Sequence, residues 1–104
     1  MKPECSRIAS VILPAIRASV AEDLYRKHNL RQADIADSLG IVQVAVSKYL
    51  NGKYSVDIAK LKEYISRNGL NCKVVSAIVN NEGKQEINSE IESLCTNKAI
   101  FEFA

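Results

Sequence analysis

Four residues spaced along positions 43–48 have side chains of the types that read the edges of DNA bases. The amide of Gln43 can make paired hydrogen bonds to adenine, and the Ser47 hydroxyl can bond a base edge or a phosphate. Val44 can contact the methyl group of thymine. On a helix these three residues share an outward face with Lys48, so we predict that the four of them read bases in the major groove.

A second set of residues flanks this segment and could hold the sugar-phosphate backbone of DNA. Gln32 begins the preceding helical segment, where backbone amides and the helix dipole favour a phosphate. The others are polar or cationic and could clamp the backbone around the inserted helix. The predicted phosphate-binding residues are Arg31, Gln32, Asn51, Lys53 and Tyr54. We expect these side chains to position the protein on DNA rather than to select a sequence.

The base-reading set requires a helix held at a defined angle, and the sequence around it predicts a pair of helices. Apolar periodicity indicates a first helix over 32–39 and a second from 42 or 43 to 50. Gly40 between them permits a left-handed turn, and Ala36 is small where the two helices must approach closely. The apolar side of the second helix consists of Ile41, Val46 and Leu50. Two helices joined in this way form a helix-turn-helix.

Periodic apolar residues predict helices in the rest of the chain as well. The segment 6–28 is interrupted at Pro14, which indicates a short helix followed by a longer one. A further helix is expected over 56–67. Residues 70–80 suit either a buried helix or a strand, and the helical surroundings favour a helix. An amphipathic helix with outward glutamates follows in 87–95, so the predicted fold class is all-α.

Length and composition allow one compact helical bundle. A chain of 104 residues has room for one core and a short appended element, and 47% hydrophobic with 25% charged residues is typical of a folded protein. We expect a DNA-binding domain over 1–68, with its motif at 32–52, and a C-terminal helical extension over 69–104 that serves in dimerisation. The apolar end, 99–103, must pack onto the domain or against a second subunit.

The charge distribution is more informative than the net charge of +2, which only weakly supports a nucleic-acid partner. Residues 43–73 contain six basic residues against two acidic ones, a balance of +4. Residues 82–104 contain five glutamates against two lysines, a balance of −3. A basic middle and an acidic tail result.

Other function classes find little support in the sequence. There is no glycine-rich phosphate loop, no cluster of His, Cys and carboxylates at ligand spacing, and no nucleophile with a nearby base. His28 stands at a helix end, where a cation complements the dipole. We therefore expect no enzymatic activity, no metal or other cofactor, and no small-molecule ligand.

The three cysteines are too few and too far apart for a disulfide scaffold or a compact zinc motif, so we interpret them as thiols of a reducing compartment. Cys72 and Cys95 lie in apolar stretches and are expected in the core, whereas Cys5 near the terminus is the more reactive candidate. No apolar run is long enough to cross a bilayer, and the start lacks the pattern of a signal peptide. A cytoplasmic location is expected.

The segment 30–53, LRQADIADSLGIVQVAVSKYLNGK, resembles the Cro and phage-repressor (XRE-like) class of helix-turn-helix regulators. The sequences of that class typically contain Gln-x-x-x-Ala, then Leu-Gly, then Ser-x-x-Leu-x-Gly. The residues at the expected positions are Gln32, Ala36, Gly40, Ser47, Leu50, Asn51 and Gly52. The resemblance places the base-reading roles on Gln43, Val44, Ser47 and Lys48. The chain departs from the pattern at Val42, where the class usually has a Ser or Thr that caps the recognition helix and contacts phosphate.

The segment 11–24, VILPAIRASVAEDL, is similar to a group of small archaeal regulators whose N-terminal helix carries Leu-Pro-Ala-Ile-Arg. Members of that group often have a cysteine near the start and a Cys-x-x-Cys near the end. Here Cys5 is present, but Lys98 stands where a second cysteine would follow Cys95. The resemblance therefore implies a DNA-binding regulator and gives no support to a metal site.

Two functions follow from these patterns. The first is a transcriptional regulator that binds a pseudo-palindromic operator as a homodimer, because one recognition helix reads only a few base pairs. The alternative is a protein-interaction adapter that keeps the helix-turn-helix fold and uses its apolar tail, 99–103, to bind another polypeptide. Changing Gln43 and Ser47 distinguishes the two, because only the regulator needs these side chains.

Overall fold

Helices account for most of residues 6–104, the part of the chain that this computed structural model describes, and no strand occurs among them. In chain order they are η1 (Ile8–Ile12), α2 (Leu13–His28), α3 (Gln32–Leu39), α4 (Gln43–Leu50), α5 (Val56–Arg67), α6 (Cys72–Val79), α7 (Lys84–Cys95) and α8 (Lys98–Phe103). The predicted all-α class is confirmed. It holds for the ambiguous segment 70–80 too, where α6 forms rather than a strand.

The interruption expected at Pro14 is present as a change in helical winding. The π-helix η1 runs directly into α2, and Pro14 is the second residue of α2. The Leu13 amide donates to the carbonyl of Ile8, five residues earlier. Because proline has no amide hydrogen to donate, one wide turn before it accommodates the missing bond. The chain therefore stays helical through this point and does not divide into two separate helices.

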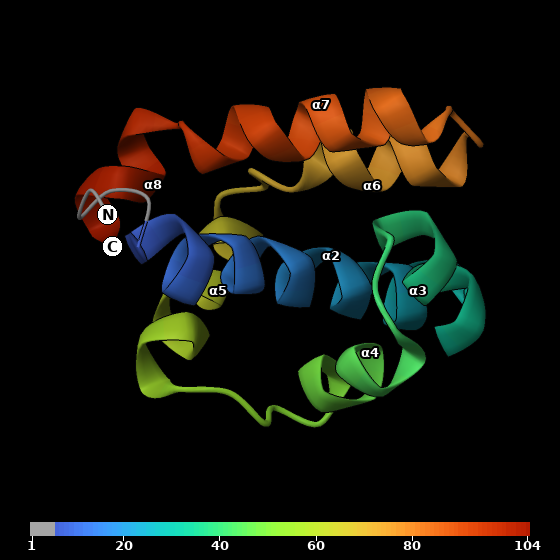
Figure 1. Cartoon of the computed structure of the whole chain (residues 1–104), viewed down its shortest axis with the longest axis horizontal. Helices are drawn as coiled ribbons and strands as arrows, with labels where there is room; N and C mark the ends of the chain where they lie inside the picture. Colours follow the sequence, from blue (N-terminus) through green and yellow to red (C-terminus); the bar gives the residue numbers. More distant parts are fainter. Residues whose placement is uncertain (1–5) are drawn as a thin grey trace.

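Helix α2 is the centre of the molecule. It buries seven residues, and α4 lies on one side of it while α6 and α7 lie on the other (Figure 1). One apolar cluster extends through all of these helices, from Ile12 near the N-terminus to Ile100 in α8. The two parts expected from the sequence, 1–68 and 69–104, thus share a core within residues 6–104.

A buried polar network joins α2 to α5 and to the start of α6. The Asn71 amide nitrogen donates to Ser19 Oγ at 2.8 Å and to Asp23 Oδ2 at 2.9 Å, and the hydroxyls of Ser19 and Ser66 lie 2.8 Å apart. Asn71 and Ser19 are both buried. Polar groups in such a position need partners, and these satisfy each other while fixing where α6 begins.

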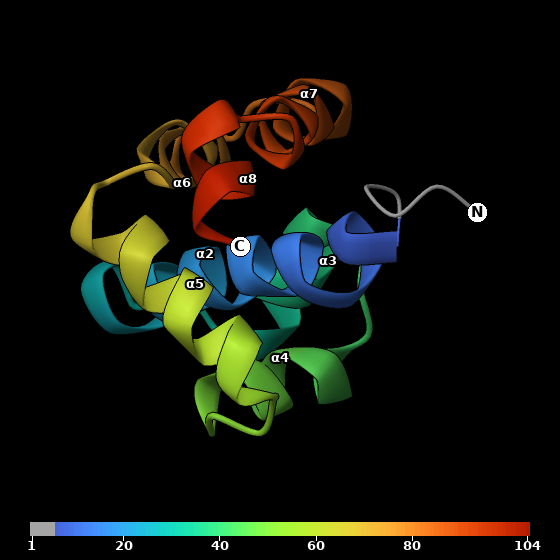
Figure 2. The same ribbon diagram turned by 90° about the vertical axis from the view of Figure 1, so that its left-hand side faces the viewer.

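The apolar end of the chain packs onto the domain. Ile100 is fully buried, and the Phe103 ring stacks on Tyr64 of α5 with ring centroids 4.3 Å apart and planes inclined by 20°. Figure 2 shows α8 beside α5 on the same face of the molecule. Of the two alternatives open for residues 99–103, packing onto the chain's own helices is the one that the structure shows.

The cysteines differ from one another in their surroundings. The expectation that Cys72 is a core residue is wrong, because it is the first residue of α6 and is exposed. Cys95 is half-buried; burial raises the pKa of its thiol, the nearby Arg17 opposes this, and Glu92 adds to it. Cys5 lies outside the described residues.

None of the helices in residues 6–104 combines the length and apolarity of a transmembrane segment. Within the same residues, no three His, Cys, Asp or Glu side chains gather as a set of metal ligands.

Candidate nucleic-acid interface

The turn between α3 and α4 has the geometry that a helix-turn-helix requires. Gly40 adopts the left-handed conformation, with φ 68° and ψ 34°, and its amide donates to the carbonyls of Ala36 and Asp37. The Ile41 amide also donates to Ala36, at 3.0 Å. These bonds close α3 and redirect the chain within two residues. A side chain with a Cβ is costly at φ 68°, which explains the glycine at this position.

Helix α4 is held by one side of its surface. Val46 is fully buried, whereas Ile41 and Leu50 are half-buried and pack against the core cluster. On the opposite side Gln43, Val44 and Lys48 are exposed, and Ser47 is half-buried. Three of the four predicted base-reading side chains are therefore accessible along one face of α4, and Ser47, on the same face, is partly covered.

The position of α4 in the molecule leaves that face open. Figure 1 shows α4 at the bottom, on the opposite side of α2 from α6 and α7. The helices that complete the core after Gly69 thus cover the far side of α2 and not the outer side of α4. Insertion into a major groove requires a helix whose outer side is not covered by the rest of the protein.

The N-terminal end of α4 is apolar and uncapped. Val42 is the N-cap residue, in extended conformation, and no side chain caps the helix. Val42 and Val44 are 70% and 65% exposed, which makes them two large apolar side chains beside the first-turn amides. Sequence reasoning treated Val42 only as a missing cap. Its exposure beside Val44 shows that it extends the apolar surface at the start of α4.

Ser47 and Asn51 form a local pair at the other end of α4. The Asn51 amide nitrogen donates to the Ser47 carbonyl at 2.9 Å and lies 3.4 Å from the Ser47 hydroxyl oxygen. The Asn51 side-chain amide has two N–H donors. One bonds the Ser47 carbonyl and the other has only the long contact with the hydroxyl, so one N–H stays available to a phosphate. In the structure its visible role is to hold the Ser47 hydroxyl at the end of the exposed face.

The basic residues near α4 differ in whether they already pair with a carboxylate. Lys48 and Lys53 are exposed, and neither has a carboxylate within 4.0 Å in the described part of the chain. Arg31 instead pairs with Asp34 at 3.2 Å. An unpaired ammonium is ready for a phosphate, whereas Arg31 must first release a carboxylate.

The remaining two predicted phosphate-binding residues lie before and after α4 in the chain. Gln32 is the first residue of α3 and is half-buried, and Tyr54 is half-buried in the link to α5. The Asp34 carboxylate lies in the first turn of α3, where it favours the helix but would repel an incoming phosphate. The signal was present in the sequence, because Asp34 stands two residues after Gln32 in the helix predicted over 32–39.

Comparison with known families points to the same region. Residues 23–71 match the family model HTH_3, described as Helix-turn-helix. This stretch begins near the end of α2, contains α3, α4 and α5, and ends at Asn71. No curated protein and no solved structure matches the chain. Geometry and family model thus agree that residues 23–71 contain a helix-turn-helix, similar to that of the Cro and phage-repressor class of DNA-binding regulators.

Proposed function

We propose that this chain is a sequence-specific DNA-binding transcriptional regulator that inserts α4 into the major groove. The observation that carries the proposal is the exposed side of α4, with Gln43, Val44 and Lys48, on a helix held from behind by the buried Val46. The Gly40 turn fixes the angle of that helix against α3. The chain recognises DNA in this proposal and catalyses no reaction on it.

Each side chain on α4 has a separate part in the proposed contact. Gln43 reads adenine through its amide, Val44 contacts a thymine methyl, and the Ser47 hydroxyl bonds a base edge or phosphate. Lys48 belongs to the base-reading set, and its free ammonium also adds charge near the backbone. Lys53 supplies a phosphate contact, with Arg31, Gln32, Asn51 and Tyr54 as further candidates.

The proposed regulator acts as a homodimer on a pseudo-palindromic operator. One recognition helix reads only a few base pairs, and two-fold pairing increases both affinity and site length. The half-sites then lie about one helical turn, roughly 34 Å, apart. Similarity of residues 11–24 to small archaeal regulators supports a place in that group, and the proposed role on DNA implies a cytoplasmic location.

Selection of bound sites from random double-stranded DNA tests the base-reading roles. The pair Gln43→Ala and Ser47→Ala should lower affinity for the selected site roughly tenfold or more, since a good bidentate base contact contributes about 1–3 kcal/mol of discrimination. A matched control is available in Gln85→Ala and Ser89→Ala, the same residue types at the same spacing on exposed positions of α7. This control pair should bind as the unchanged chain does.

The outcome that would contradict the base-reading roles is an equal fall in affinity, or no fall, in the two pairs. If the α4 pair leaves DNA binding intact and a protein partner depends on residues 99–103, the adapter function replaces the regulator. Because Ile100 is buried, that partner test should use Phe103→Ala rather than removal of the tail.

Lys53, and Lys48 through its added charge near the backbone, should have a further signature in the salt dependence of binding. Replacing Lys48 and Lys53 by alanine should weaken binding to all sequences and reduce the slope of log affinity against log salt by about one for each phosphate that is no longer neutralised. Lys73 and Lys98, exposed on α6 and α8, are the controls. An unchanged slope in the Lys48 and Lys53 variant would contradict their contact with the backbone.

A further inference from the structure

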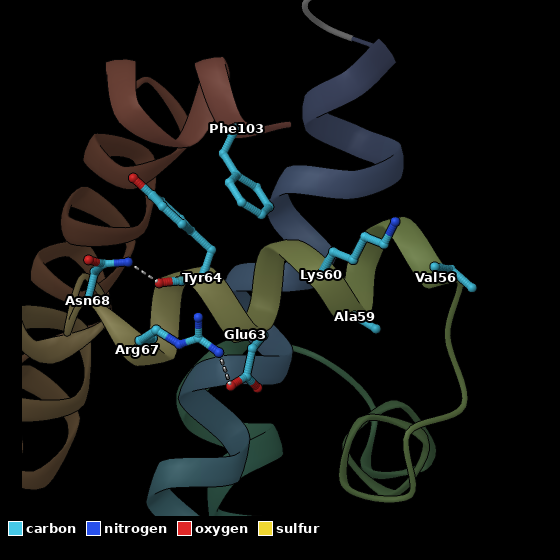
Figure 3. Close-up of a pocket in the computed structure, with 8 residues that line it drawn as sticks. All are labelled: Val56, Ala59, Lys60, Glu63, Tyr64, Arg67, Asn68 and Phe103. Atoms are coloured by element: carbon cyan, nitrogen blue, oxygen red, sulfur yellow. Dashed lines mark hydrogen bonds and ion pairs between the residues drawn. The ribbon is translucent and has the colours of Figure 1, made fainter.

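An open apolar groove of about 570 Å³ lies between α5 and α8 (Figure 3). Its floor is one face of α5, and the stacked rings of Tyr64 and Phe103 stand along one edge. Val56 is 68% exposed and Phe103 46%, so large apolar side chains face solvent here. The groove therefore combines exposed apolar side chains with charged ones from the same helix.

The residues of the groove form a single stripe along α5. Val56, Ala59, Lys60, Glu63 and Arg67 are spaced by three, one, three and four, which places them on one face of the helix. In the middle of the stripe stands the small Ala59, which allows another helix to approach closely. Figure 3 shows these side chains along α5, with the rings of Tyr64 and Phe103 beside them.

The charges on the stripe are complementary to a second copy of the same stripe. Lys60 and Glu63 have opposite charges one helical turn apart. Lys60 has no carboxylate within 4.0 Å in residues 6–104, while Glu63 contacts only Arg67, at 3.5 Å on the surface. In a two-fold contact, residue i of one subunit faces residue j of the other and the reverse. Lys60 can therefore gain the partner's Glu63, twice in each dimer.

The shape of the stripe has the same symmetry as its charges. In an antiparallel pair of α5 helices centred between Lys60 and Glu63, the small Ala59 of each copy faces the large Tyr64 ring of the other. The exposed Val56 then meets the alkyl part of the partner's Arg67. A small residue opposite a large one, at both ends of the contact, allows two identical surfaces to interlock.

We infer that the face of α5 with the Phe103 ring of α8 is the contact surface for a second copy of this chain, with Lys60 and Glu63 pairing across the two-fold axis. This contact would be the dimer interface of the proposed regulator. Its role in binding DNA rests on the proposed function, whereas the contact itself is inferred from the surface of α5. In Figure 2, α5 and α8 are turned to the viewer, and no residue of the contact surface belongs to α4.

The test measures the dimer without DNA, by sedimentation equilibrium of the full chain. Lys60→Glu and Glu63→Lys should each raise the dimer dissociation constant about tenfold or more, because each places like charges opposite one another. The double variant Lys60→Glu with Glu63→Lys restores opposite charges and should return the constant close to its original value. Lys73→Glu, an exposed charge reversal on α6, should leave it unchanged.

The inference is overturned if the unchanged chain is monomeric at every concentration, if neither single reversal weakens the dimer, or if the double variant fails to restore it. Lys60, Glu63 and Lys73 are all exposed, so circular dichroism of each variant should match that of the unchanged chain. Site selection on DNA is an independent measurement. If site selection yields a DNA site but the Lys60 and Glu63 variants dimerise as the unchanged chain does, the proposed function is supported and only the proposed dimer contact is contradicted.

Discussion

Helices α4 and α6 have the same length of eight residues and are used in opposite ways. In α4 only Val46 is buried, and polar or charged side chains fill much of the outer face. In α6 four residues are buried, namely Val74, Val75, Ala77 and Ile78. An isolated helix of this length is marginal in water, so each must be held by its neighbours.

The two helices are held by different means. Helix α6 is anchored by apolar burial and by Asn71, which connects its start to α2. Helix α4 is anchored by the buried Val46, by the half-buried Tyr49 and Leu50 that pack against the core, and by the turn at Gly40. The comparison shows that one face of a helix can remain uncovered, and free for a partner, when the turn before it fixes its direction and the opposite face packs on the core.

The largest expected effect lies in the core of α6. Ile78→Ala should lower the free energy of unfolding by about 2–5 kcal/mol, because it removes buried methyl groups and leaves a cavity. Val79→Ala, at the exposed end of the same helix, should change it by less than about 0.5 kcal/mol. Urea unfolding of both variants measures the difference. Equal values would show that α6 is not the buried member of the pair.

The polar anchor of α6 should have the next largest effect. Asn71→Ala removes the donor to Ser19 and Asp23 and should cost about 1–3 kcal/mol, since the buried hydroxyl of Ser19 is left with one partner fewer. Asn80→Ala, an exposed C-cap of the same helix, is the control. Urea unfolding measures both variants. If Asn71→Ala lowers the free energy of unfolding no more than Asn80→Ala does, Asn71 does not anchor α6.

A smaller destabilisation is expected at the turn that directs α4. Gly40→Ala meets no atom within 4 Å of the added Cβ, so the cost is conformational and amounts to about 1–2 kcal/mol for a left-handed residue. Because the turn also fixes the angle of α4, DNA affinity should fall together with stability. Gly83→Ala is unsuitable as a control, since its Cβ would meet Glu86 Oε2 at 2.6 Å. Unchanged stability and affinity would show that the turn tolerates a side chain.

The smallest expected change is a gain at the start of α4. Val42→Ser supplies the missing side-chain acceptor at the N-cap and should raise the free energy of unfolding by about 1 kcal/mol. The variant also removes an exposed apolar side chain, so affinity for thymine-containing half-sites should decrease if Val42 contacts DNA. A fall in stability would mean that Val42 packs against a neighbour in a way that serine cannot replace.

Much of the fold could be predicted from the sequence because the signals are local. The bounds of α3 and α4 follow from apolar periodicity and from Gly40, whose left-handed conformation is a property of one residue. The all-α class depends on the same periodicity. The type of helix before Pro14 was less predictable. A chain can accommodate the missing amide hydrogen of proline by a break, a kink or a π-turn. The packing of the long helical segment against its neighbours decides among these, and here it is a π-turn.

The side chains around the site show where local signals end. Val44 and Lys48 on the exposed face could be predicted from helical spacing, whereas the Arg31–Asp34 pair and the Asn51–Ser47 bond depend on rotamers that spacing does not specify. The exposure of Cys72 was also mispredicted, because its apolar sequence neighbours do not reveal that the first residue of α6 faces away from the core.

The sequence by itself determined the helices, the turn at Gly40 and the residue types on the outer face of α4, because these depend on backbone preferences and on a period of 3.6 residues. Only the tertiary structure decided that α6 and α7 pack on the far side of α2 and leave the outer side of α4 uncovered. It also placed Phe103 on Tyr64 and thereby created the groove beside α5. Both outcomes depend on contacts between segments far apart in the chain, which no local pattern encodes.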